Sequence, residues 1–440
     1  MKVHNVAIVG CGTVGGATAQ LLTRDRDILK ERTGLNLNLK YIVSKTYKHA
    51  RELNLDSSLF ESDLDKVLDD PDVEIVAELV GGITLAKEII EKSIKAGKHI
   101  VTANKALLAH YGAELLSMAR DRGVALSFEA SCAGGVPIVR ALYDGLIANR
   151  IDAIYGIVNG TCNYILTEMT QIGRSYKEAL KDAQNKGLAE ADPFLDVSGT
   201  DTAHKLAILA AIAFSQKIDF DKIPVTGIDT LDIIDVSFGQ ELGYIIKLLA
   251  IAQRMERGIS LRVHPAFIAK DHPLAWISGP FNAVSVYGHA VGHTMYYGRG
   301  AGGSPTASAV VSDIVSAALG TASLVFHKLK VWPHNNHPAV QLPPEEVRSR
   351  YYIRLMAEDK PGVFAKIADV LGRHLISISS VLQKEPHEPG ANPLFVPVVI
   401  TTHTAQAGNV SSAIEELDSL DVISGKSVCI AILDEHEETI

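Results

Sequence analysis

The stretch VAIVGCGTVG, residues 6–15, decides the fold. Its apolar start predicts a buried strand, and its three glycines precede an amphipathic helix. In a dinucleotide-binding turn, Gly10 permits the sharp bend, Gly12 admits a pyrophosphate close to the backbone, and Gly15 lets helix and strand pack closely. The amides at the helix start, which include those of Thr13 and Val14, then hold the phosphates. The stretch therefore predicts a dinucleotide-binding domain.

Short β-branched runs alternate with helical patterns over the first third of the chain. The runs are VAIVG, LKYIV, EIVAELV, HIVTAN and ALSFEA. This alternation predicts a parallel sheet with right-handed crossovers. We expect a Rossmann-type α/β domain over residues 1–135, completed by residues 300–340. In the completing segment we expect Ser304 to cap a helix, with Pro305 as its first helical residue.

Two further domains follow from the pattern. Residues 136–299 are rich in helical stretches and predict an α+β domain, to which the family resemblance given below assigns substrate binding and dimerisation. The proline-rich, aperiodic residues 334–350 are typical of a linker. After it, strand and helix patterns alternate in the order βαββαβ, which predicts a ferredoxin-like module over residues 350–440.

Composition excludes several classes of function. The net charge of −9 argues against a nucleic-acid or anionic-membrane partner, because either would favour a basic face. No apolar run approaches the roughly 20 residues that span a bilayer. The four cysteines form no CxxC pair. We therefore expect a reducing, cytoplasmic setting without disulfides or structural zinc.

The end of the second predicted strand bears on cofactor choice. Residues 41–45, YIVSK, contain no acidic residue to bind an adenosine ribose diol. Ser44 and Lys45, together with Lys48, could instead receive a 2′-phosphate. This favours NADP(H) over NAD(H), although Lys45 could also be an ordinary solvated surface charge.

Several motifs together carry a resemblance to a known family. They are GxGxVG (10–15), ELVGG (78–82), VTANK (101–105), FEASCAGGVPI (128–138), VNGTCNYIL (158–166), GLAEADPFLDVSGTDTAHKLAIL (187–209) and GRGAGGSPTASAVVSD (298–313). In this order they resemble monofunctional homoserine dehydrogenase over nearly the whole chain. The C-terminal module, with DKPGVF at 359–364, resembles an ACT domain. The resemblance implies the reversible NAD(P)H-dependent reduction of L-aspartate 4-semialdehyde to L-homoserine, a step toward threonine and methionine.

The resemblance also assigns roles within the 187–209 stretch. Asp201 and Lys205 are four residues apart, so they share one helix face. By resemblance, Glu190 and Asp201 bind the substrate, and Lys205 donates the proton. Lys105, at the end of HIVTAN, is expected beside the nicotinamide and the substrate. Which lysine moves the proton stays open, with Lys205 ranked first, and a plain surface ion pair is the alternative for Asp201–Lys205.

Further cofactor and metal contacts rest on the same resemblance. Gly187, Gly302 and Lys105 are expected at the cofactor, and Thr84 and Thr102 could line its groove. The FEASCAGGVP stretch is expected to bind a sodium ion through backbone carbonyls, since oxygen ligands suit a hard cation. The carbonyls are those of Glu129, Cys132, Gly134 and Val136. A tight turn between two domains is the alternative.

Two rival functions can be stated. Cys132 could be the thiol nucleophile of a phosphorylating semialdehyde dehydrogenase, but such a thiol needs a base held beside it. The chain could also be a non-catalytic, nucleotide-gated amino-acid sensor, in which Lys105, Glu190, Asp201 and Lys205 would be expected to degrade. The ACT module could bind threonine or serve only as a dimer contact. A homodimer or homotetramer is expected by resemblance.

Overall fold

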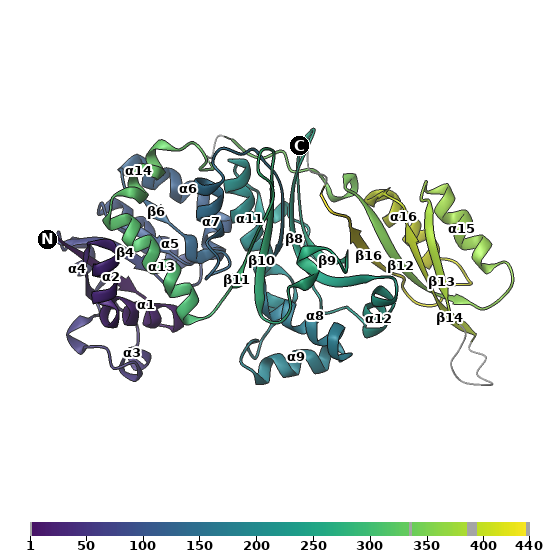
Figure 1. Cartoon of the computed structure of the whole chain (residues 1–440), viewed down its shortest axis with the longest axis horizontal. Helices are drawn as coiled ribbons and strands as arrows, with labels where there is room; N and C mark the ends of the chain where they lie inside the picture. The colour runs from purple at the N-terminus through teal and green to yellow at the C-terminus, as the bar shows by residue number, and fades with distance from the viewer. Residues whose placement is uncertain (1, 334–336, 385–393, 437–440) are drawn as a thin grey trace.

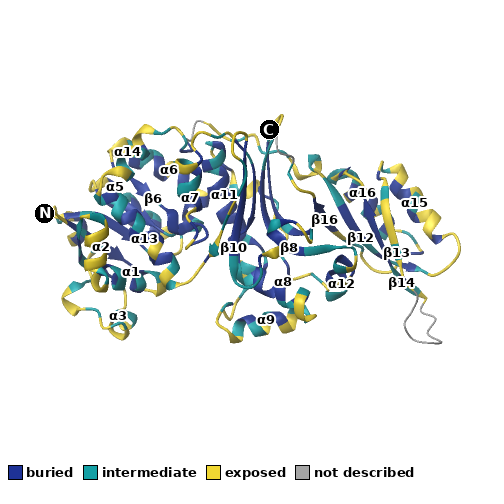
Figure 2. Cartoon of the chain, in the orientation of Figure 1, coloured by how far each residue is buried: buried dark blue, intermediate teal, exposed yellow. Residues whose placement is uncertain are grey.

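In the part of the chain that the structure describes, the strands form two β-sheets, one of six strands and one of ten. The computed structural model describes residues 2–333, 337–384 and 394–436. The six-stranded sheet, the strands of the middle third and the C-terminal module follow one another along the long axis of the molecule, and the last two share the ten-stranded sheet (Figure 1). The strands of both sheets are largely buried, and the helices covering them expose their outer faces (Figure 2).

The six-stranded sheet is parallel and has the order β3-β2-β1-β4-β5-β6. Its strands are β1 (Val3–Val9), β2 (Asn36–Val43), β3 (Phe60–Glu61), β4 (Val73–Glu78), β5 (His99–Thr102) and β6 (Leu126–Ser127). The order reverses between β1 and β4, the place where open α/β sheets bind their ligands. The predicted Rossmann-type fold is confirmed, and the short β3 is a strand that the sequence pattern did not predict.

Helices surround this sheet. They are α1 (Thr13–Arg24), α2 (Arg26–Thr33), α3 (Lys48–Glu52), α4 (Leu64–Asp69), α5 (Thr84–Lys95) and α6 (Lys105–Arg122), with α7 (Ile138–Arg140) after the last strand. The later helix α13 (Gly303–Ala318) returns to pack on α1, where a β-carbon at Gly303 would lie 3.3 Å from the Thr13 carbonyl oxygen. α14 (Thr321–Lys328) follows it.

The predicted cap of α13 is wrong. The helix begins at Gly303 and has Gly302 as its N-cap, so Ser304 and Pro305 both lie inside the first turn. Gly302 has φ 120°, a conformation that glycine adopts readily and other residues do not. The helix therefore begins at a glycine whose backbone conformation is unusual, and no side-chain hydroxyl caps it.

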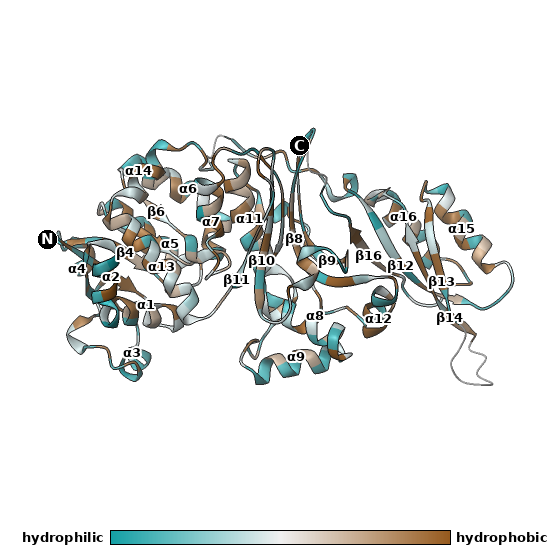
Figure 3. Ribbon diagram, in the orientation of Figure 1, coloured by the Kyte–Doolittle hydropathy of each residue, from teal (hydrophilic) through white to brown (hydrophobic). Residues whose placement is uncertain are grey.

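The ten-stranded sheet contains a path in the order β11-β10-β7-β8-β9-β16-β12-β14-β13, with β15 paired to β12. These strands are β7 (Ile151–Ile157), β8 (Tyr244–Met255), β9 (Gly258–Ala269), β10 (Phe281–Gly288), β11 (Gly292–Arg299), β12 (Arg348–Glu358), β13 (Ile378–Gln383), β14 (Phe395–Thr402), β15 (Ala405–Gln406) and β16 (Val428–Leu433). The central strands are strongly hydrophobic (Figure 3). The middle third thus contains more strand than its helical sequence patterns suggested.

Helices of the middle third pack against this sheet. They are α8 (Gly160–Ile172), α9 (Tyr176–Asn185), α10 (Phe194–Val197), α11 (Thr200–Phe214) and α12 (Ile233–Glu241). Of these, α8, α11 and α12 contact β8 directly. Burial of their apolar faces against the sheet fixes the position of α11.

The C-terminal module confirms the predicted βαββαβ order. It runs β12, α15 (Val363–Arg373), β13, β14, α16 (Ala407–Asp418) and β16. Its last strand joins the central sheet, because residues 431–433 of β16 pair in parallel with residues 266–268 of β9. A second link is buried: the Asp235 carboxylate of α12 accepts hydrogen bonds from Arg354 and Tyr352 of β12, at 2.6–2.9 Å.

Within the part of the chain that the structure describes, no single helix is long and apolar enough to cross a membrane. The bent pair α13 and α14, with an 82° break, meets that measure only when the two helices are taken together.

The glycine turn before α1 predicts a difference between two alanine variants. A β-carbon at Gly15 would lie 1.9 Å from the Gly10 carbonyl oxygen, whereas one at Gly12 would meet nothing within 4 Å. We expect Gly15→Ala to destabilise the fold by about 1–3 kcal/mol, the usual cost of overpacking. Gly12→Ala should unfold as the wild type does and weaken dinucleotide binding. Urea unfolding and a fluorescence titration measure the two effects, and equal stability of the two variants would contradict this account.

Candidate active site

A cavity of about 470 Å³ opens at the carboxyl edge of the parallel sheet, where β4 and β5 end. The opposite wall comes from α10, α11 and the loop before them. Four residues predicted from the sequence line it: Val14, Lys105, Glu190 and Asp201. Its remaining lining residues are Glu78, Leu79, Gly81, Gly82, Ala103, Asn104, Ala106, Asp192, Leu195, Asp196 and His204.

Two lysine ammonium groups share the Asp201 carboxylate. Lys205 Nζ donates to Asp201 Oδ2 at 2.7 Å, and Lys105 Nζ lies 3.1 Å from Asp201 Oδ1. Asp201 and Lys205 are one turn apart on α11, as their spacing predicted. Lys105 begins α6, on the dinucleotide-domain side of the cavity. The shared carboxylate therefore joins the two walls.

The two lysines differ in exposure. The Lys205 side chain is 10% exposed, and its Nζ also donates to the Val158 carbonyl at 2.7 Å. The Lys105 side chain is 42% exposed and lines the cavity. Lys205 is thus committed to two buried acceptors, while the Lys105 ammonium is accessible from the cavity.

Charge and burial set the protonation states of this cluster. Burial alone would raise the pKa of the Asp201 carboxyl, but the nearby ammonium groups of Lys205 and Lys105 hold it well below its usual range. In turn, the Asp201 charge raises the pKa of the Lys105 ammonium. At neutral pH, Asp201 is therefore a carboxylate and Lys105 is protonated.

Asn159 aligns the acidic side chains of this wall and was not predicted. Its Nδ2 donates to Asp201 Oδ2 at 2.9 Å and to Asp196 Oδ1 at 2.7 Å. Its Oδ1 accepts from the Cys162 amide and so caps α8. Burial raises the pKa of the Asp196 carboxyl. The signal available in the sequence was an asparagine before a helix in VNGTCNYIL, which reads as a cap alone.

Glu78 is a second residue that the sequence analysis missed. This buried carboxylate at the end of β4 accepts from the Thr102 hydroxyl at 2.7 Å and from the Val80 amide at 2.9 Å. Thr102 in turn accepts from the Asn104 amide at 3.0 Å, and Asn104 caps α6. Because α6 starts at Lys105, this chain of bonds fixes the position of Lys105 at the cavity. Burial raises the pKa of the Glu78 carboxyl.

Other predicted cofactor residues lie outside this cavity lining. Gly10, Gly12, Thr13 and Gly15 form the turn and first residues of α1, next to Val14. Ser44 and Lys45 follow β2, and the Ser44 hydroxyl donates to the Thr46 carbonyl at 2.8 Å.

Two more predicted glycines occupy helix ends. Gly302 caps α13 beside the start of α1, because Gly303 packs on Thr13. Gly187 is exposed just after α9, with φ 69°. Thr84, the first residue of α5, is also absent from the described cavity lining.

The loop predicted to bind sodium is a buried turn. Ala133 and Gly134 have φ 50° and 30°, and the Val136 amide donates to the Ala133 carbonyl at 2.7 Å. The Glu129 carboxylate accepts from the amides of Val139 and Arg140, so its side chain is engaged at a helix start. Burial raises the pKa of the Glu129 carboxyl to about 7. Among the described residues no group of three or more His, Cys, Asp or Glu side chains could hold a metal ion.

Cys132 is poorly suited to act as a nucleophile. Its side chain is fully buried, and burial raises the pKa of the thiol to about 12. Its sulfur lies 3.8 Å from the Lys205 carbonyl and 3.7 Å from the Ser131 hydroxyl. A nucleophilic cysteine instead needs a lowered pKa and access to substrate. The geometry therefore disfavours the thioester mechanism.

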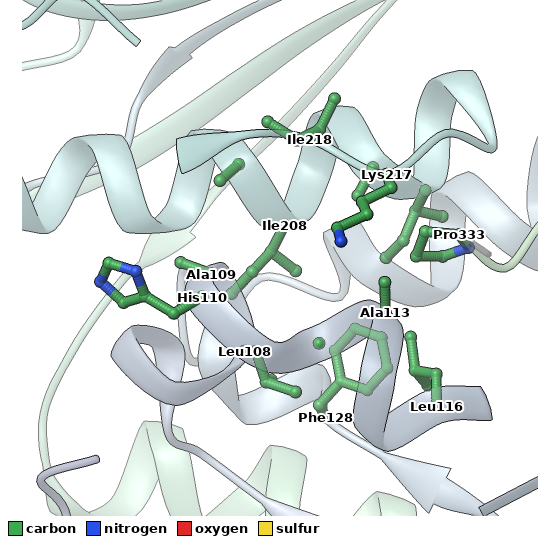
Figure 4. A pocket seen from close by; sticks show the side chains of 14 residues that line it. Leu108, Ala109, His110, Ala113, Leu116, Phe128, Ile208, Lys217, Ile218 and Pro333 are labelled. Carbon is green, nitrogen blue, oxygen red and sulfur yellow. The ribbon is translucent and has the colours of Figure 1, made fainter. Parts of the chain in front are cut away.

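A small cavity of about 40 Å³ lies behind the site, between α6 and α11 (Figure 4). Apolar side chains such as Leu108, Phe128 and Ile208 surround it, and His110 and Lys217 lie at its margin. This volume accommodates a water or two and not a metabolite. Of these two cavities, the larger one at Lys105 is therefore the one that fits a substrate.

Comparison with known proteins identifies what the chain and its domains are similar to. Family models match at residues 137–315 (homoserine dehydrogenase), 10–129 (homoserine dehydrogenase, NAD binding domain) and 351–422 (ACT domain). A homoserine dehydrogenase of Pseudomonas aeruginosa is 42% identical, with 98% of this chain and 99% of that protein covered.

Solved structures give the same result. The homoserine dehydrogenase of Thiobacillus denitrificans is 42% identical, covers 99% of both chains and superposes with a TM-score of 0.91. A hyperthermophilic archaeal homoserine dehydrogenase in complex with NADPH is 26% identical and covers 72% of this chain and 98% of its own, with a TM-score of 0.62. With a relative this similar over its full length, a Rossmann-type domain and a C-terminal ACT module, the chain belongs to the homoserine dehydrogenase family.

Proposed function

We propose that this protein catalyses the reversible NADP(H)-dependent reduction of L-aspartate 4-semialdehyde to L-homoserine. The observation that carries the proposal is the Asp201 carboxylate held between two ammonium groups at the ligand-binding edge of a dinucleotide sheet. Reduction of an aldehyde requires a proton donor for the developing alkoxide. The substrate also carries an ammonium group, which suits a cavity lined by Glu190, Asp192 and Asp196.

The position of the ammonium groups favours Lys105 as the proton donor, although the sequence ranked Lys205 first. Lys105 Nζ is accessible from the cavity, and its raised pKa keeps it protonated for reduction. Lys205 Nζ is buried between Val158 and Asp201, which suits the task of holding the carboxylate in place. Glu190 and Asp201 then bind the substrate.

The glycine turn fits a dinucleotide. At Gly12 the space that a β-carbon would occupy is open, so a pyrophosphate can approach the backbone there, and the amides at the start of α1 would hold it. When bound, the nicotinamide supplies or takes up the hydride. Ser44 and Lys45 follow β2 without a neighbouring acid, which favours a 2′-phosphate. The archaeal relative that was solved with NADPH supports the same preference.

Initial rates of L-homoserine oxidation test the activity and the cofactor together. We expect turnover with both cofactors and a kcat/KM at least about tenfold higher with NADP than with NAD, since one charge-assisted contact is worth about 1.5–3 kcal/mol. Lys45→Ala should reduce this preference and leave the NAD reaction unchanged. Equal kcat/KM values for the two cofactors would contradict the assigned preference, and absence of oxidation with either would contradict the activity.

Substitution of the two lysines separates their roles. We expect Lys105→Met to lower kcat by about 10²–10⁴-fold, the usual contribution of a positioned acid or base, without changing NADP affinity. Asp201→Asn removes the charge that raises the Lys105 pKa, so that pKa falls. In the reduction direction the rate declines as the donor loses its proton, and the basic limb of the pH profile should therefore move to lower pH.

The Lys205→Met variant serves as the comparison. It leaves the buried Asp201 without its closest counter-ion, which costs about 3–5 kcal/mol in stability. Its main defect should therefore appear in urea unfolding. A basic limb that stays in place in Asp201→Asn, or a Lys105→Met enzyme with near wild-type turnover, would assign proton transfer to another group.

We also propose a sodium ion at the loop of residues 129–136. The carbonyl oxygens of Cys132 and Gly134 accept no hydrogen bond from any described residue, although both residues are buried. The Glu129 carbonyl accepts only a long bond of 3.5 Å, and that of Val136 accepts one at 2.8 Å. Buried carbonyls with spare lone pairs suit a hard cation, which would brace the turn that leads from β6 to α7.

Exchange of sodium for potassium tests this site. At constant ionic strength, we expect the thermal midpoint to fall when sodium chloride is replaced by potassium chloride. Gly134→Ala should abolish the difference, because its β-carbon would lie 2.9 Å from the Gly300 carbonyl oxygen and deform the turn. Identical midpoints in the two salts would exclude a sodium-selective site.

Assembly, location and regulation complete the proposal. β11 is an edge strand with exposed Met295 and Tyr297, and such an edge is commonly covered by a second chain, so we propose a homodimer or homotetramer.

All four cysteines are free thiols, which fits a location in the reducing cytoplasm. The ACT module would bind an amino acid such as threonine.

A further inference from the structure

A second large cavity lies where the catalytic sheet meets the C-terminal module. Its volume is about 470 Å³, and its walls come from β9, β12, β16 and the segment of residues 224–231. β9 and β16 pair only at residues 266–268 and 431–433. The residues that precede these pairs line the cavity from opposite sides, so the space is a wedge between two strands of one sheet.

Arg262 of β9 lies in the wall of this wedge. The residue is only 8% exposed, and its Nη1 donates to the Ser260 hydroxyl at 2.9 Å. A guanidinium carries five N–H donors, so this bond leaves most of them unused. No acidic residue is among the described residues that line the cavity. Burial accordingly lowers the pKa of Arg262, and two tyrosines are the groups that counteract it.

The surroundings indicate which kind of ligand would satisfy this cation. A guanidinium matches a planar carboxylate through two parallel hydrogen bonds. Tyr351 of β12 brings a hydroxyl from the C-terminal side, and Thr226 and Thr230 bring two more. His264 adds no charge, because burial lowers its pKa to about 4. The remaining lining is largely apolar, with Leu231, Leu261, Val263 and Ile430 among its side chains.

We propose that this wedge binds a small aliphatic carboxylate, free or as part of an amino acid, through an ion pair with Arg262. The single positive charge of Arg262 neutralises the single negative charge of a carboxylate. A phosphate dianion would need a second cationic side chain to neutralise it. The proposal extends the amino-acid response suggested for the ACT module. It places the ligand between that module and the catalytic sheet.

The segment that forms one wall of the wedge is hydrogen-bonded to a helix of the active site. The Thr226 amide donates to the Val263 carbonyl at 2.8 Å, and the Ile228 amide donates to the Val197 carbonyl at 2.8 Å. Val197 ends α10, whose Asp196 lines the active-site cavity. The packing leaves no slack, since a β-carbon at Gly227 would lie 2.2 Å from the Val197 carbonyl oxygen.

The same contact extends to the catalytic helix. Gly199 caps α11 two residues before Asp201, and its β-carbon position lies 2.9 Å from Val225 and 3.3 Å from Val263. A ligand that shifts residues 224–228 must therefore shift α10 or the start of α11. Occupation of the wedge should change the kinetics at Lys105 and Asp201.

Binding is measured on the full-length protein without a turnover assay. Thermal shift and calorimetry would use L-threonine, L-valine and isovalerate, which share a carboxylate, with isovaleramide as an uncharged analogue and inorganic phosphate as another anion. We expect at least one carboxylate to bind and isovaleramide not to bind. Tighter binding of L-valine than of isovalerate would show that the site takes an amino acid. Tighter binding of isovalerate would show that it takes a simple organic acid. Tighter binding of phosphate than of every carboxylate would overturn the proposed ligand class.

Arg262→Met tests the residue itself. We expect its Kd for the bound carboxylate to rise at least about tenfold, while its unliganded thermal midpoint stays at or above that of the wild type, since the removed charge has no counter-ion. Arg257→Met is the matched control, because Arg257 is exposed in the β8–β9 turn and pairs with Glu346. It should bind as the wild type does.

The possible outcomes separate this proposal from the catalytic one. Unchanged affinity in Arg262→Met, or no carboxylate binding in the wild type, would overturn the site even in an active enzyme. Binding that alters neither kcat nor KM for L-homoserine would overturn the coupling through α10. Binding lost in Arg262→Met and retained in Arg257→Met supports the site, whatever cofactor preference the activity assay finds.

Discussion

The structure of the active site depends on one carboxylate. The Asp201 carboxylate contacts the Lys205 ammonium of its own helix and the Lys105 ammonium of α6, so a single buried anion joins two helices from different domains. Burial of an unpaired carboxylate would cost several kcal/mol of desolvation free energy, and the attraction of the two ammonium groups offsets that cost. Because Lys105 is also the first residue of α6, the same ion pair aligns the end of β5 with α11.

The active-site cavity and the wedge have similar volumes and opposite electrostatic arrangements. The active-site cavity is lined by several carboxylates, and Lys105 balances part of their charge from the same wall. The wedge at Arg262 has a cation and no acid among its described lining residues. Residues 192–199 separate them, with Asp196 toward one and Val197 bonded to the wall of the other. Within this segment Val197 and Gly199 are buried while Phe194 and Leu195 are exposed, so the contact between the two cavities runs through its buried residues.

Local chemistry explains which features were predictable from the sequence. The roles of Gly10, Gly12 and Gly15 follow from a turn of six residues, and Asp201 and Lys205 share a face because they are four residues apart on a helix. The contact of Lys105 with Asp201 depends on tertiary packing between two domains, and the sequence did not predict it. The family resemblance placed Lys105 only beside the nicotinamide and the substrate. Glu78 and Asn159 were missed because each acts through a partner distant in sequence, Thr102 and Asp201 respectively.

The ten-stranded sheet was harder to predict for a related reason. β16 reaches β9 across most of the C-terminal half, and strand patterns alone do not specify which strands become neighbours. That pairing, over three residues, and the buried bonds of Asp235 to Arg354 and Tyr352 attach the ACT module at two places. Two separate attachments fix the orientation of the module while leaving an unfilled space between them. A sheet that closed fully there would bury Arg262 without a partner, and the open wedge keeps its unused donors accessible to a ligand.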